Sequence, residues 1–156
     1  MKHAEKKESI LTREDLRKEA NIVLQLSIDE LKGFGSLIPK AMFFMRNGKK
    51  TVFFLDFCSK EDKVKVTLEI MSFAKDSKPE AFMYVTDCFI SEDRDILLSH
   101  SKNRRQAIIL NCESADGGFS LLQEYEVDEN GQVILGKKVE SPTGVEEGLF
   151  ANMLAV

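Results

Sequence analysis

The spacing of apolar positions predicts a long helix at the start of the chain. Thr12-Arg13-Glu14-Asp15 is a capping-box variant, in which the Thr12 hydroxyl accepts an amide hydrogen bond and Asp15 reaches back. Apolar residues then recur at helical spacing until Gly33-Phe34-Gly35 provides a stop, which predicts a helix over 13–32. Residues 20–30 also alternate as a strand would, so a strand remains an alternative there.

A hairpin is predicted next, because Asn47-Gly48 stands between two apolar runs at 41–46 and 49–55. Both turn residues tolerate the positive φ of a type I′ turn, and this is the strongest short-range hairpin signal. The two runs are apolar at consecutive positions. We therefore expect both strands to be central in a sheet that is covered on each face.

A second helix is predicted over 60–76, between the capping-box-like Ser59-Lys60-Glu61-Asp62 and Pro79. Its interior also alternates, so a strand stays open over 64–71. A helix after the hairpin can act as a crossover that makes one parallel pair of strands, and such a crossover would be right-handed.

The second half of the chain is rich in strand patterns separated by turn residues. Residues 91–103 are expected to form a long surface loop, and 145–156 a short closing helix. The strands are expected over 80–90, 105–112, 119–127 and 132–139. Together these elements predict an α+β fold: a mainly antiparallel sheet of about six strands packed with two to three helices.

Composition bounds the class of protein. A chain of 156 residues suits one domain, which we place at 12–156 behind a flexible tail at 1–11. With 43% hydrophobic and 31% charged residues, neither a disordered nor a membrane-spanning chain is expected. A net charge of -4 argues against a dedicated nucleic-acid binder. The absence of an exported-type leader and an odd count of 3 cysteines favour a reducing cytoplasm.

The sequence contains little that indicates catalysis. His3 and His100 are the only histidines, and no nucleophile motif accompanies them. Cys58, Cys88 and Cys112 lack zinc-site spacing and are expected to be structural thiols. We therefore expect no catalytic residue, no metal and no cofactor.

The binding candidates are Asp87, Lys102, Arg104 and Arg105. Guanidinium pairs favour phosphate or carboxylate partners in bidentate geometry. The preferred interpretation is plainer: one arginine pairs with Asp87 across the end of the sheet and the other is solvated.

The order of elements over 40–112 carries one resemblance. An apolar hairpin and a capped helix precede a strand like 80–89, a charged loop, and a strand opening with Arg104-Arg105-Gln106-Ala107. In this order the chain resembles a loose group of short, uncharacterised bacterial and phage-type proteins. The resemblance implies no particular activity.

The leading functional hypothesis is a non-enzymatic cytoplasmic module that binds a protein partner or itself, with a homodimer as one form. It depends on the missing catalytic motifs, the apolar hairpin and the apolar segment 149–156. The alternative is a small-ligand-binding protein or an enzyme that uses the basic sheet edge near Arg104 and Arg105. A third hypothesis is weak nucleic-acid association through the same cluster.

Overall fold

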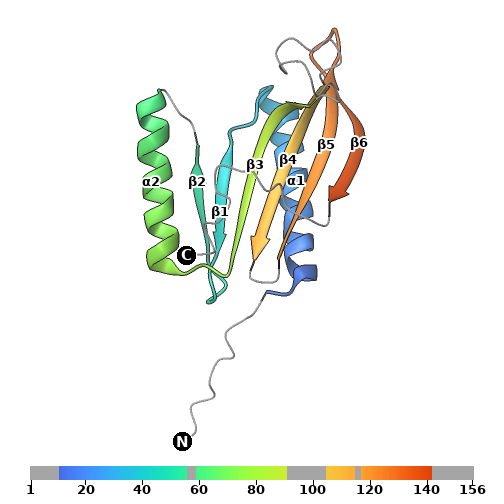
Figure 1. Ribbon diagram of the computed structural model, residues 1–156. Coiled ribbons are helices and arrows are strands. Elements are labelled where there is room, and N and C mark those ends of the chain that lie inside the picture. Colours follow the sequence, from blue (N-terminus) through green and yellow to red (C-terminus); the bar gives the residue numbers. More distant parts are fainter. Residues whose placement is uncertain (1–10, 56–58, 91–104, 115–116, 142–156) are drawn as a thin grey trace, which may run out of the picture.

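The computed structural model of the protein describes residues 11–55, 59–90, 105–114 and 117–141 (Figure 1). These ranges form an antiparallel sheet with helices on both faces, which confirms the predicted α+β class. The elements are α1 (Arg13–Phe34), β1 (Lys40–Phe44), β2 (Lys50–Phe54), α2 (Lys60–Ser77), β3 (Ala81–Ile90), β4 (Arg105–Ser114), β5 (Gly117–Val127) and β6 (Val133–Ser141). The predicted tail, the 91–103 loop and the closing helix at 145–156 lie outside the described residues, except for Leu11.

The strands follow the order β2-β1-β3-β4-β5-β6, and each neighbouring pair is antiparallel. The turn at Asn47-Gly48 places β2 on one side of β1, so β3 pairs with the other side. Helix α2 therefore connects two strands that are not neighbours. The expectation of one parallel pair is wrong, because β1 already separates β2 from β3.

Helix α1 is fixed at both ends by the predicted signals. The Thr12 hydroxyl accepts a hydrogen bond from the Asp15 amide at 3.1 Å, and the Asp15 carboxylate accepts one from the Thr12 amide at 3.1 Å. Gly35 ends the helix in the left-handed region at φ 75°, where glycine has no steric cost. The buried residues follow a helical stripe, which decides against a strand over 20–30. They are Leu16, Ala20, Val23, Leu24, Ser27, Ile28 and Leu31.

Each helix covers a different part of the sheet. Alternation along β3 sends Met83 and Val85 into the core beneath α1, which extends over β4 and β5. Phe82 points to the opposite face, where Phe43 and Ile70 form a second core between α2 and strands β1–β3. The predicted helix over 60–76 is thus confirmed. It covers only the β1–β3 part of its face of the sheet.

The hairpin is confirmed, but its two strands differ in environment. Strand β1 lies inside the sheet, and Phe43 on it is fully buried. Strand β2 lies at the sheet edge, and Phe54 is 62% exposed. The expectation that both strands are central is therefore wrong for β2, whose second side meets no strand among the described residues.

Neither of the two described helices, α1 and α2, is long and apolar enough to cross a bilayer.

Candidate functional site

The structure separates the two predicted binding residues that it describes. Arg105 is opposite Ile90 in the register of β3 and β4, three residues from Asp87. An odd offset along a strand changes the face of the sheet, so Asp87 and Arg105 project to opposite sides. The expected ion pair between them is wrong. Arg105 instead pairs with Glu124 of β5 at 2.7 Å. Lys102 and Arg104 lie outside the described residues.

Asp87 lies on the face that α1 covers, where the Tyr125 hydroxyl donates to its carboxylate at 3.4 Å. Burial raises the pKa of Tyr125 to about 12, and the negative charge of Asp87 contributes in the same direction. The phenol is therefore protonated near neutral pH. It serves as a hydrogen-bond donor that ties β5 to β3 across β4.

An open depression of about 560 Å³ lies at this end of the sheet, between β4, β5 and β6. Arg105, Glu124 and Tyr125 line it with apolar residues of β6. An anion entering it would compete with Glu124 for the guanidinium. A partly exposed ion pair contributes at most about 1 kcal/mol, so the competition is possible but gives the anion no prepared site.

The described thiols are poor nucleophiles. Burial raises the pKa of Cys88 to about 11, and the adjacent Asp87 carboxylate acts in the same direction. Burial likewise raises the pKa of Cys112 to about 12. Within the described ranges, no three His, Cys, Asp or Glu side chains are grouped so that they could hold a metal ion.

Large apolar side chains are also exposed on α1 and around the hairpin. They belong to α1, to the segment that leads into β1 and to β2: Ile22, Leu26, Ile38, Val52 and Phe54. We call these five residues the α1–hairpin surface. Leu26 is 61% exposed on a helix whose opposite face is buried, and Phe54 is 62% exposed on a strand whose opposite face is half-buried.

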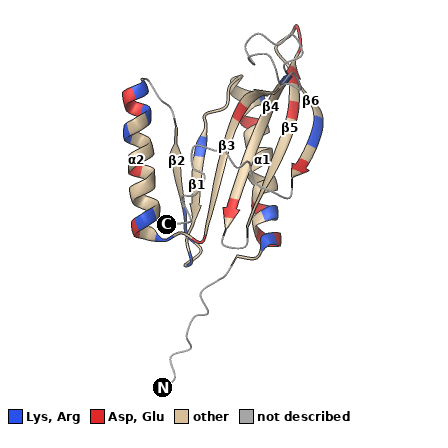
Figure 2. Ribbon diagram, viewed as in Figure 1, with Lys and Arg blue, Asp and Glu red and all other residues tan. Residues whose placement is uncertain are grey.

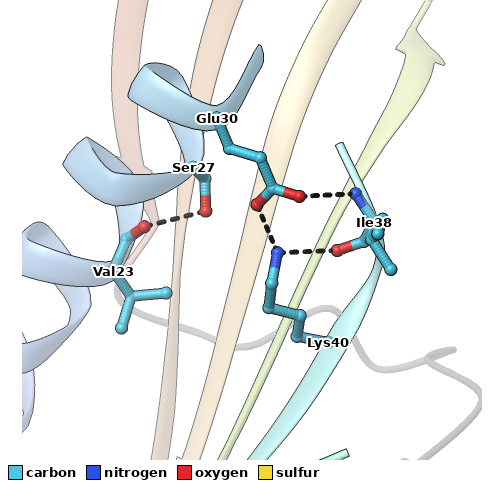
Figure 3. Close-up of polar contacts among 5 residues, drawn as sticks. All are labelled: Val23, Ser27, Glu30, Ile38 and Lys40. Carbon is cyan, nitrogen blue, oxygen red and sulfur yellow. Dashed lines mark hydrogen bonds and ion pairs between the residues drawn. The ribbon is translucent and has the colours of Figure 1, made fainter. Parts of the chain in front are cut away.

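Polar contacts hold α1 against the hairpin beside this surface (Figure 3). The Glu30 carboxylate forms an ion pair with the Lys40 ammonium and also accepts a hydrogen bond from the Ile38 amide at 3.2 Å. The Lys40 ammonium donates to the Ile38 carbonyl at 2.9 Å and lies 5.8 Å from the centre of the Phe54 ring. These contacts connect α1 with the hairpin.

A second ion pair connects α1 with β2. The Lys50 ammonium of β2 lies 2.7 Å from the Glu19 carboxylate of α1 and 5.6 Å from the centre of the Phe44 ring. The elements that carry the exposed apolar residues are thus connected by two ion pairs. Exposed apolar patches are typical of protein-binding sites.

Helix α2 carries a second apolar stripe, formed by Val64, Leu68 and Met71 at helical spacing. Their exposed fractions lie between 50% and 60%. The stripe belongs to a single element, and among the described residues its side chains have no ion pair beside them that connects α2 to another element. It therefore provides a matched comparison for the α1–hairpin surface.

The outer edge of β2 adjoins the α1–hairpin surface. The Leu55 amide donates to the Pro39 carbonyl at 2.8 Å, so Leu55 directs its backbone groups toward the β1 side. Backbone direction alternates along a strand, which turns the N–H and C=O groups of Lys50, Val52 and Phe54 away from β1. Among the described residues no strand pairs with that edge.

Comparison with known proteins identified no relative of this chain. A scan against protein-family models, a search of curated proteins and a search of solved structures each found no match.

Sequence reasoning missed two features of these sites. Glu124 could not be recognised as the partner of Arg105, because the pairing depends on the register between β4 and β5. The exposure of Phe54 was missed because both hairpin strands were expected to be central in the sheet, and nothing in the local sequence distinguishes Phe54 from the buried Phe43.

Proposed function

We propose that the protein is a non-enzymatic cytoplasmic interaction module that binds a protein partner through the α1–hairpin surface. One observation supports this above the others. Five large apolar side chains of α1 and the hairpin are exposed, and two ion pairs connect these same elements.

The free energy available from this surface is substantial. Covering apolar area contributes about 25 cal/mol for each Å², so burying a side chain such as Phe54 or Leu26 contributes roughly 1.5–3 kcal/mol. A few such side chains at the centre of an interface carry most of its affinity. The charged pairs then give orientation and exclude poorly matched partners.

A capture experiment tests the proposal. The tagged protein is used as bait in native lysate, beside a variant with Leu26→Glu and Phe54→Glu, and the retained proteins and small molecules are identified by mass spectrometry. The matched control carries Val64→Glu and Leu68→Glu on the α2 stripe. We expect proteins that the parent and the control retain and that the α1–hairpin variant loses.

Two results would contradict the proposal. Retention lost only in the control would place binding on α2, and a parent that retains small molecules but no protein would favour the ligand-binding alternative. Circular dichroism of all three proteins ensures that a loss of binding is not a loss of fold.

A further inference from the structure

The two edges of the sheet are built differently. At β6 the register shifts between Gln123 and Tyr125, and the strand carries Lys137 and Lys138 (Figure 2). Bulges and lysines are the usual means by which an edge strand avoids pairing with another chain. Strand β2 has a regular register with β1, and its one charged residue, Lys50 at its start, is ion-paired with Glu19 of α1.

From this difference we infer that β2 pairs with β2 of a second copy, in antiparallel register centred on Val52, and joins two sheets into one. The inference rests on the proposed function, since it names the partner as another copy of the same chain.

The backbone of β2 is self-complementary in that register. Val52 lies opposite Val52 of the other copy, and Lys50 lies opposite Phe54. All three residues direct their N–H and C=O groups outward, so each opposed pair exchanges both of its hydrogen bonds. A register shifted by one residue would oppose outward groups to inward ones and lose these bonds.

The side chains agree with the same register. Val52 and Phe54 lie on the α1 side of the sheet, because they pair with Met42 and Lys40 there. A two-fold axis perpendicular to the sheet puts the α1 sides of both copies on one side of the joined sheet. The exposed Val52 and Phe54 side chains of the copies then meet each other. Lys50 faces an aromatic ring and not another lysine, which avoids like charges directly opposite.

Light scattering and amide hydrogen exchange test the inference on the full chain. The mass should rise from 17.7 kDa toward twice that value as the concentration increases through the micromolar range. At high concentration the amides of Lys50, Val52 and Phe54 should become protected. The amides of Thr51 and Phe53 provide the internal control, because they bond to β1 and should be protected at every concentration.

Variants at the two-fold axis extend the test. Val52→Lys places two like charges opposite each other and should shift dissociation to higher concentration by at least tenfold, while leaving the β1–β2 backbone bonds intact. Val52→Cys should form an intermolecular disulfide, because opposed residues in such a pair have Cα atoms about 5.5 Å apart. Ile134→Cys on β6 is the matched control and should not cross-link above the background of the parent cysteines.

Several results would overturn the inference: a mass of 17.7 kDa at every concentration, a dimer in which Lys50, Val52 and Phe54 stay unprotected, or stronger cross-linking at Ile134→Cys than at Val52→Cys. A strictly monomeric protein that still captures another protein in lysate would retain the proposed function and refute only the self-pairing.

Discussion

Neighbouring residues of β3 meet different surroundings. Asp87 lies on the α1 side with the Tyr125 hydroxyl, whereas Cys88 lies on the opposite side across from Ala107. The Asp87 carboxylate is nevertheless adjacent to Cys88 along the chain. Its negative charge adds to the effect of burial, which raises the pKa of Cys88. Cys112 lies in the core beneath α1 and is 1% exposed. Chemical reactivity at these positions therefore follows from burial and charge.

We predict slow reaction of Cys88 and Cys112 with a thiol reagent in the native protein. With a pKa of about 11, the Cys88 thiolate is roughly one part in ten thousand at pH 7. Mass spectrometry of labelled peptides gives the rate for each cysteine, and the denatured protein gives the unprotected rate. Cys58 carries the same prediction from the sequence alone. Fast labelling of Cys88 would revive the nucleophile hypothesis.

The raised pKa values of these two thiols also determine how the stability of the fold changes with pH. Their pKa values are raised from 9.0 to about 11 and 12, so the folded protein keeps these protons to higher pH than the unfolded chain does. The stabilisation is complete below pH 9 and is lost as the pH rises through 11 and 12.

At the scale of elements, the hairpin joins two strands of similar sequence but opposite burial. The Phe43 ring lies 5.1 Å from the Phe82 ring and 5.2 Å from the Phe73 ring, counted between centroids. Phe54 contacts the Lys40 ammonium and is mostly exposed. The difference depends on what lies beside each strand. Strand β1 lies between β2 and β3 and beneath α2, whereas among the described residues β2 has only β1 beside it.

We predict that Phe43→Ala lowers the free energy of unfolding by about 3–5 kcal/mol, because it leaves a cavity in the α2 core. Phe54→Ala is the matched control and should change it by about 0.5 kcal/mol or less, as exposed positions do. Urea unfolding followed by circular dichroism measures both at low protein concentration. Equal losses for the two variants would show that the hairpin is not placed as described.

At the scale of the whole molecule, the helices cover opposite faces over different strands. Helix α1 packs on β3–β5 and α2 packs on β1–β3 (Figure 1). The core beneath α1 also includes Phe44 of β1 but no residue of β2. The residues of the α1–hairpin surface are exposed, and among the described residues no strand pairs with the β2 edge. The sequence favoured a different route to self-association, through the apolar residues of 149–156.

Truncation of the chain distinguishes self-association through residues 149–156 from pairing through the β2 edge. We predict that a chain ending at residue 148 still dimerises with the concentration dependence of the parent in light scattering, because the β2 edge is unchanged. Val52→Lys in the same truncated chain should then yield the monomer. If truncation alone yields the monomer, the sequence-based route is correct and pairing through β2 is not.

Local signals were sufficient to determine most elements of the described fold. Thr12 with Asp15 and Ser59 with Asp62 set the starts of both helices, since capping involves residues only three positions apart. The Asn47-Gly48 turn set the hairpin for the same reason. Helix and strand remained open at 20–30 and 64–71, where both periodicities were present and burial by the sheet decided for helix.

The candidate sites were decided by tertiary structure. Whether Arg105 meets Asp87 or Glu124 depends on strand register, which sets the face of every side chain but is fixed by contacts far apart in the sequence. Whether Phe54 is core or surface depends on β2 being the edge of the sheet, and strand order is likewise non-local. The sequence by itself determined the elements and the α+β class, because caps, turns and periodicity act within a few residues. Only the packed sheet determined which side chains are left to meet a partner.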